Sequence, residues 1–150
     1  MCESKSDYLY IMLYPMNNNM IKIGITNDPH RRMKDLYSTS MPAPFKISHL
    51  WHVSDARRAE ALSHDYFSGH RYNGKREFFE IYPGEQPVNI PDELINPLTN
   101  PYENGLEFIA DKIMEVMDYY SIDYEIMDNQ KYQTWYENGK KLFPNGPKEF

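Results

Sequence analysis

The sequence has only one cysteine, Cys2, so an intrachain disulfide is impossible and nothing points to an oxidising compartment. It lacks the run of about 18 apolar residues that a membrane-spanning helix needs. Residues 1–7 carry charges in place of the apolar stretch of a signal peptide. These absences favour a cytoplasmic protein, or a nuclear one in a eukaryotic or viral setting, that has no contact with a membrane.

Several local signatures of catalytic sites are also missing. The chain has no HExxH motif and no paired cysteines, so a zinc site would have to be assembled from scattered histidines. No glycine-rich phosphate loop, G-x-S-x-G elbow or dinucleotide fingerprint occurs. These gaps disfavour zinc hydrolases, P-loop enzymes, serine hydrolases and dinucleotide-dependent enzymes. The histidines from which a zinc site would be drawn are His49, His52, His64 and His70.

Positive charge is scarce as well, because the net charge is −6, which is unusual for a protein that binds phosphates. The charge is unevenly distributed. Residues 21–80 contain ten Lys/Arg against seven Asp/Glu, whereas residues 81–150 contain five against thirteen. A surface that binds phosphates is therefore expected in the first half if the protein has one. The acidic second half could fold back over that surface, receive a basic protein partner, form a homodimer interface or simply complete the core.

The first half of the chain begins with a predicted β-hairpin. Residues 8–14 form an apolar and aromatic run that ends at Pro15 and three asparagines, and residues 21–26 then alternate strictly. Successive side chains of a strand point to opposite faces of the sheet. If the aliphatic positions pack on the core, the other face carries Tyr8, Tyr10, Lys22 and Gly24.

Two helices and two further strands follow. Asp28 with Pro29 predicts the start of one helix and Asp55 predicts the cap of another. A third strand is expected over 45–53, interrupted at His49, and a short last strand over 77–81. The third strand is inferred from Phe45, Ile47, Trp51 and Val53. The apolar positions expected to point inward are Met33, Leu36 and Tyr37 in the first helix and Ala59, Leu62 and Tyr66 in the second.

This order of elements predicts an α+β fold in which helices flank a small, mainly antiparallel sheet of three to four strands. The expected domain covers residues 8–82. Residues 83–105 are rich in proline and predict an extended strap, and residues 106–150 predict an acidic, helical C-terminal extension. The apolar stripe of that helix consists of Leu106, Ile109, Ile113, Val116 and Met117.

Five short motifs follow one another in the predicted domain. They are Tyr8-Leu9-Tyr10, Lys22-Ile23-Gly24, Arg32, the pair Glu60 and His64, and Arg76-Glu77-Phe78-Phe79. In this order they resemble the GIY-YIG nuclease superfamily, and in particular its short phage and meiosis-associated branch, in which the second triad is Lys-Ile-Gly. The resemblance covers about half of the chain and implies a divalent-metal-dependent endonuclease that hydrolyses phosphodiester bonds in DNA.

The resemblance also implies a role for each catalytic candidate. Glu77 would anchor one Mg²⁺ or Mn²⁺ ion, Tyr10 would orient or deprotonate the attacking water, and Arg32 would stabilise the phosphorane. His64 would protonate the leaving group or bind the next phosphate. An unperturbed tyrosine has a pKa of about 10 and is a poor base, so Lys22 would assist Tyr10. Further substrate contacts are expected from Tyr8, Gly24, Thr26, Arg31, Glu60 and Arg76.

The chain departs from the superfamily pattern at two positions. Tyr8 replaces the usual glycine of the first triad, and Lys22 replaces the usual tyrosine of the second, although lysine is normal for this branch. Many relatives add an asparagine after the metal-binding glutamate, for which Asn89 is a candidate. These departures and the acidic balance keep an alternative open, namely a catalytically inactive module of the same fold that binds nucleic acid or a protein.

Overall fold

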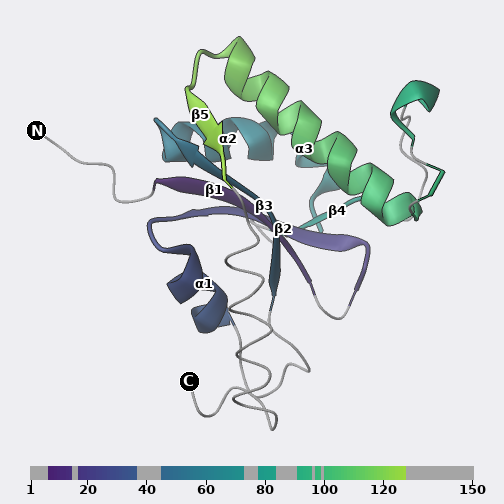
Figure 1. The fold of residues 1–150 in the computed structure, drawn as a ribbon, viewed down its shortest axis with the longest axis horizontal. Helices are drawn as coiled ribbons and strands as arrows, with labels where there is room; N and C mark the ends of the chain where they lie inside the picture. Colours follow the sequence, from purple (N-terminus) through teal and green to yellow (C-terminus); the bar gives the residue numbers. More distant parts are fainter. Residues whose placement is uncertain are drawn as a thin grey trace, which may run out of the picture.

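The computed structural model describes residues 7–14, 17–36, 45–72, 78–83, 91–95, 97–98 and 100–127. These residues form one antiparallel sheet with strand order β4-β2-β1-β3-β5, together with three α-helices (Figure 1). The α+β prediction is therefore confirmed. The elements are β1 (Tyr8–Leu13), β2 (Met20–Thr26), α1 (Pro29–Leu36), β3 (Lys46–Val53), α2 (Ala56–Tyr66), β4 (Phe78–Glu80), α3 (Pro101–Tyr119) and β5 (Tyr124–Ile126).

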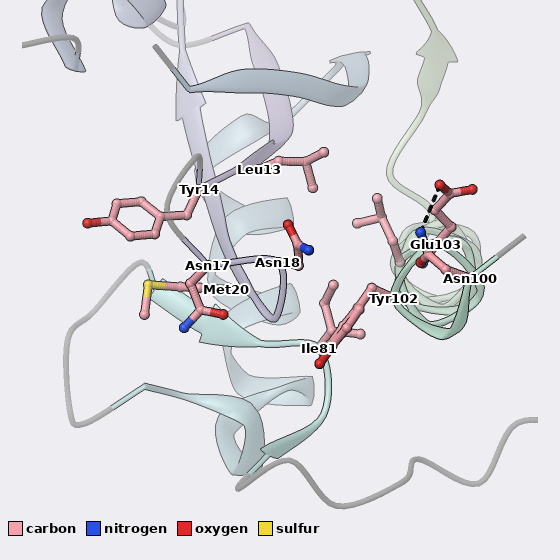
Figure 2. Close-up of a pocket in the computed structure, with 10 residues that line it drawn as sticks. Leu13, Tyr14, Asn17, Asn18, Met20, Ile81, Asn100, Tyr102 and Glu103 are labelled. Carbon is pink, nitrogen blue, oxygen red and sulfur yellow. Dashed lines mark hydrogen bonds between the residues drawn. The ribbon is translucent and has the colours of Figure 1, made fainter. Parts of the chain in front are cut away.

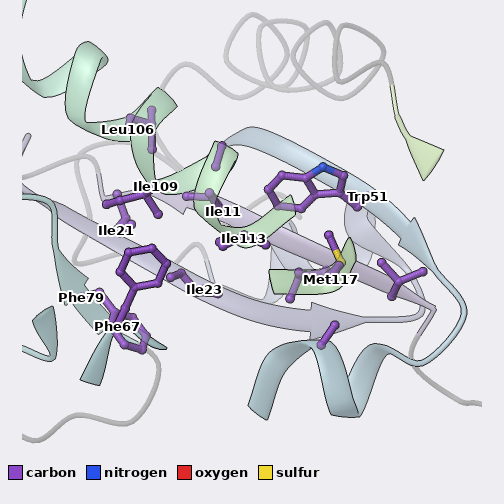
Figure 3. Close-up of a cluster of buried hydrophobic side chains, with 14 of the residues drawn as sticks. Ile11, Ile21, Ile23, Trp51, Phe67, Phe79, Leu106, Ile109, Ile113 and Met117 are labelled. Atoms are coloured by element: carbon purple, nitrogen blue, oxygen red, sulfur yellow. The ribbon is translucent and has the colours of Figure 1, made fainter. Parts of the chain in front are cut away.

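The sheet separates two apolar clusters. Helices α2 and α3 cover one face, here called the α2–α3 face, and the short helix α1 covers the other, here called the α1 face (Figure 1). Figure 3 shows the larger cluster between the sheet and α3. The predicted alternation of the hairpin is confirmed, since Leu9, Ile11 and Ile23 belong to the α2–α3 face and Tyr10 and Met12 to the α1 face.

Strand β3 contains a bulge that divides its apolar side chains between the two faces of the sheet. Phe45 and Ile47 pack on the α1 face, whereas Trp51 and Val53 pack on the α2–α3 face. The pairing with β1 shifts register between Ile11 and Met12, which leaves Ser48 as an extra residue in β3. An extra residue reverses which face the following side chains occupy. The predicted third strand is therefore confirmed, and the bulge lies beside His49, where an interruption was expected.

Helix α2 begins as predicted, because the Asp55 side chain accepts a hydrogen bond from the Arg58 amide at 3.1 Å. Ala59 is fully buried, but Tyr66 is 52% exposed, so its predicted inward orientation was wrong. The helix ends at Tyr66, and the next residue, Phe67, occupies the core with 3% exposure. At the end of the helix the ring of Phe67 therefore points into the core, and the ring of Tyr66 points to solvent.

Helix α1 also begins where the sequence predicts. The carboxylate of Asp28 accepts a hydrogen bond from the Arg31 amide at 3.2 Å. Met33 is fully buried on the α1 face and Leu36 packs against the same cluster. Tyr37, the third predicted inward position, lies outside the described residues.

Helix α3 and strand β5 are part of the same core and sheet as the predicted domain. The predicted apolar stripe of α3 is buried, mostly within the cluster that β1, β2 and α2 also form. Strand β5 pairs with β3 and was not predicted. Helix α3 begins at Pro101, inside the segment predicted as a strap. None of the described helices is both long and apolar enough to cross a membrane.

A histidine and a glutamate connect α3 to the sheet. His49 Nε2 of β3 lies 3.3 Å from Glu107 Oε2 of α3, and the His49 ring stacks on Trp51 at 5.8 Å between centroids. Burial lowers the pKa of His49 from its usual 6.5, although Glu107 and Asp111 act in the opposite direction. Burial, together with Glu107, raises the pKa of Asp111.

The lowered pKa of His49 predicts a loss of stability in mild acid. The His49 imidazole binds a proton more readily in the unfolded chain than in the folded protein, because its pKa is lower when folded. Its contribution to the free energy of unfolding is therefore fully present above about pH 6.5 and is lost as the pH falls through the lower pKa of the folded protein. Urea unfolding at several pH values should show a smaller decline for His49→Gln than for the wild type below that pH. Identical declines would contradict the prediction.

Candidate functional site

The site is organised by the close approach of Tyr10 to Gly24. The two residues are directly paired in the β1–β2 ladder. A Cβ atom added at Gly24 would lie 2.5 Å from the Tyr10 hydroxyl oxygen and 2.8 Å from the ring carbon that bears it. Because Gly24 has no side chain, the Tyr10 ring can lie directly against the backbone of β2. Gly24 was expected to contact the substrate, but the space beside its Cα is occupied by the Tyr10 ring.

Arg32 of α1 meets the phenol at this point. Its Nε donates a hydrogen bond to the Tyr10 hydroxyl at 3.4 Å, across 22 residues of sequence. The structure therefore brings together two of the predicted catalytic groups, the phenol and the guanidinium. Tyr10 has 0% exposure, however, so its hydroxyl faces Arg32 and the protein interior rather than open solvent.

Lys22 lies on the same face as Tyr10 and is also buried, with 4% exposure. Lys22 lies two residues before Gly24 on β2 and is paired with Met12 of β1, whereas Gly24 is paired with Tyr10. On its other side Lys22 pairs with Phe78 of β4, and its Nζ lies 4.9 Å from the centre of that ring. An ammonium group over an aromatic face is favoured electrostatically, most strongly where water is excluded.

A polar hollow of about 300 Å³ opens beside Arg32. It is lined by Thr26 at the end of β2 and by Arg31, Arg32 and Asp35 of α1, with Ile25 and Asn27. Arg31 Nε lies 3.8 Å from an Asp35 carboxylate oxygen, and both side chains are mostly exposed. Two guanidinium groups against one carboxylate give the hollow a local positive charge, which suits a phosphate group.

Tyr8 also lies on the α1 face, two residues before Tyr10, where β1 begins and β2 ends. It pairs with Thr26 on one side and with His52 on the other. Its ring meets the His52 ring edge-on, with 5.1 Å between centroids. The predicted substrate contacts Tyr8, Thr26 and Arg31 therefore all lie around the part of the site that reaches solvent.

His64 lies on the other face of the sheet. Its Nε2 is 2.8 Å from the Ile23 carbonyl oxygen, and its ring packs at 5.0 Å on Phe79, a member of the α2–α3 core. A carbonyl can only accept, so Nε2 carries the proton of this bond. Glu60, one helical turn earlier, approaches to 4.0 Å. The structure thus separates His64 and Glu60 from Tyr10 and Arg32.

The expected metal ligand is not placed. Glu77, Arg76 and Asn89 lie outside the described residues, and no cluster of three metal-binding side chains occurs within the described part of the chain. The described charged groups on the α1 face near Tyr10 are the guanidinium groups of Arg31 and Arg32, the side chain of Lys22 and the carboxylate of Asp35. Three basic groups and one carboxylate fit an anion better than a divalent cation, which prefers several oxygen ligands.

A second hollow, of about 140 Å³, lies between the β1–β2 hairpin and the start of α3 (Figure 2). Asparagine and tyrosine side chains line much of it, including Asn17, Asn18 and Tyr102. None of the residues predicted for the catalytic site lines it. It is therefore separate from the site around Tyr10.

The Tyr10–Gly24 contact predicts a strong effect of one methyl group. Gly24→Ala should lower the free energy of unfolding by about 1–3 kcal/mol, because the ring must move or the strands must separate. Gly69→Ala is the matched control, since a Cβ at Gly69 meets nothing within 4 Å. Urea unfolding of both variants checks this expectation, and equal effects at the two glycines would contradict it.

The His64 contact predicts a structural effect. His64→Ala removes the donor to the Ile23 carbonyl and should lower the free energy of unfolding by roughly 1–3 kcal/mol. Chemical denaturation of the variant measures this loss. A variant as stable as the wild type would show that the bond between α2 and β2 contributes nothing.

Comparison with known families adds a final observation. Residues 7–96 match the T5orf172 domain, a family of phage-associated, nuclease-type domains. No curated protein and no solved structure matches the chain significantly. The matched segment covers more than half of the 150 residues and includes strands β1 to β4 with helices α1 and α2. The chain therefore belongs to the T5orf172 domain family.

Proposed function

We propose that this protein is a divalent-metal-dependent endonuclease of the GIY-YIG type that hydrolyses phosphodiester bonds in DNA. The observation that carries the proposal is the contact between the Arg32 guanidinium and the Tyr10 hydroxyl beside a positively charged hollow. Membership of a nuclease-type family supports it. The order of the five sequence motifs favours the GIY-YIG type, and the Lys-Ile-Gly triad favours its short phage-associated branch.

Arg32 is the group best placed to stabilise the reacting phosphate. Its Nε is bonded to Tyr10, which helps to fix the guanidinium plane, and Arg32 lines the hollow. A fixed cation stabilises the extra negative charge of the phosphorane without reorganising during the reaction. Thr26 and Arg31, which line the same hollow, would hold the flanking phosphates.

Tyr10 has a more restricted role in this arrangement than the resemblance implies. Its hydroxyl accepts a hydrogen bond from Arg32, so it positions the guanidinium. Since the phenol is fully buried, contact with an attacking water requires α1 to move away from the sheet when DNA binds. The ammonium group of Lys22, buried on the same face, would favour the phenolate once that happens.

The metal would be bound by Glu77, which directly precedes Phe78, the β4 residue that contacts Lys22. A bound Mg²⁺ or Mn²⁺ ion supplies positive charge and lowers the pKa of a coordinated water. The described residues supply the remaining functions, which are to bind and orient the phosphate. Positive charge from the ion also offsets the acidic balance of the chain.

A second candidate function follows from the burial of Tyr10. A site whose phenol stays sealed beneath α1 would bind phosphates through Arg31 and Arg32 without cleaving them. The chain would then be an inactive module of the nuclease-type fold that binds nucleic acid or, through its acidic second half, a basic protein.

A cleavage assay distinguishes the two functions. Supercoiled plasmid and single-stranded DNA are incubated with Mg²⁺ or Mn²⁺, and the wild type is compared with Glu77→Gln, Arg32→Gln and the control Lys34→Gln, an exposed residue of α1. We expect Arg32→Gln to slow cleavage by about 10²- to 10³-fold, Glu77→Gln to abolish it, and Lys34→Gln to leave it near the wild-type rate.

Two outcomes would decide against the metal-dependent endonuclease. Cleavage that persists both in Glu77→Gln and in EDTA would rule out the metal site at Glu77. DNA binding that depends on Arg31 and Arg32, with no cleavage in either metal, would support the inactive module.

A further inference from the structure

Four side chains form a row across the sheet, next to the row that contains Tyr10. Tyr8 is paired with Thr26 on β2 and with His52 on β3, and His52 is paired with Glu125 on β5. Directly paired residues of antiparallel strands point to the same face of the sheet. The edge-on contact of the Tyr8 and His52 rings agrees with this register. The row Thr26–Tyr8–His52–Glu125 therefore lies on the α1 face.

This row adjoins the proposed catalytic groups. Tyr10 occupies the next row on the same face, between Gly24 and Leu50, and two residues along a strand correspond to about 7 Å. Thr26, at one end of the row, lines the hollow with Arg32. The row thus runs from the hollow, at Thr26, past the start of β1 to the ends of β3 and β5.

His52 differs from the buried groups Tyr10 and Lys22 in being open to solvent. Tyr10 and Lys22 are buried, whereas His52 and Glu125 are exposed. An exposed imidazole can touch a bound substrate and can recover a proton from water. The titratable groups that face it from neighbouring strands are Tyr8 of β1 and Glu125 of β5, a carboxylate that can orient an imidazole ring.

We propose that His52 is the proton donor to the leaving oxygen in the endonuclease reaction, and that Glu125 is a residue that positions it. The inference rests on the proposed function. Water forms the new bond to phosphorus and releases one proton to the solvent, the bond between phosphorus and the 3′ oxygen breaks, and the His52 imidazolium transfers its proton to that oxygen. The neutral imidazole is then reprotonated from solvent.

The assignment gives His52 the role that the sequence motif suggested for His64. The two histidines lie on opposite faces of the sheet, and only His52 shares a face with Arg32 and Tyr10. It also gives a function to β5, which carries Glu125. This strand lies outside the segment that matches the family, residues 7–96.

The test compares two DNA substrates in Mn²⁺, one of ordinary composition and one in which sulfur replaces the 3′ oxygen at the cleaved bond. A thiolate leaves without protonation, since a thiol is far more acidic than an alcohol. We expect His52→Gln to cut the oxygen substrate about 10²- to 10⁴-fold more slowly than the wild type and the sulfur substrate at nearly the wild-type rate. Glu125→Gln should show a smaller defect of the same kind.

His64→Gln serves as the comparison, because a change that acts only through the fold slows both substrates by the same factor. If the wild type cuts DNA but His52→Gln retains the wild-type rate on the oxygen substrate, or is equally slow on both substrates, the role of His52 is overturned while the endonuclease function stands. If the wild type cuts neither substrate, the proposed function itself fails, and the role of His52 fails with it.

Discussion

The geometry of the whole site depends on one contact. The phenol ring of Tyr10 lies against β2 at Gly24, the position that has no side chain. Gly24 lets the Tyr10 ring lie against β2, and the ring in turn presents its hydroxyl to Arg32. Any side chain at Gly24 would push the ring toward α1 and displace the guanidinium. A backbone feature of β2 thereby determines where a charge carried by α1 is held, although the two residues do not share an element.

The two faces of the sheet divide the work of the protein. On the α2–α3 face, aliphatic and aromatic side chains from two helices and four strands form the larger core, and His64 contributes a bond to the backbone of β2. On the α1 face, within the described part of the chain, an eight-residue helix covers a smaller cluster that includes Tyr10. A short helix with only two buried residues needs less free energy to move than a long one with many.

Local patterns in the sequence predicted those features that depend on neighbouring residues. The alternation of the hairpin, the caps at Asp28 and Asp55 and the stripe of α3 all follow from periodicity and capping, and the structure confirms them. The bulge at Ser48 and the pairing of β5 depend on tertiary contacts that no local pattern encodes.

The candidate site was predictable only in part for the same reason. Tyr10 and Arg32 were predicted to meet, and they do. The spacing of Glu60 and His64 predicts that they share a helix face, but it does not say which face of the sheet the helix covers. His52 could be assigned to the α1 face only once the register of β1 and β3 was known. The pairing of β5 with β3 also means that the inherited family segment, residues 7–96, is shorter than the folding unit. A fragment that ended there would leave β3 with a bare hydrogen-bonding edge, an open template for aggregation.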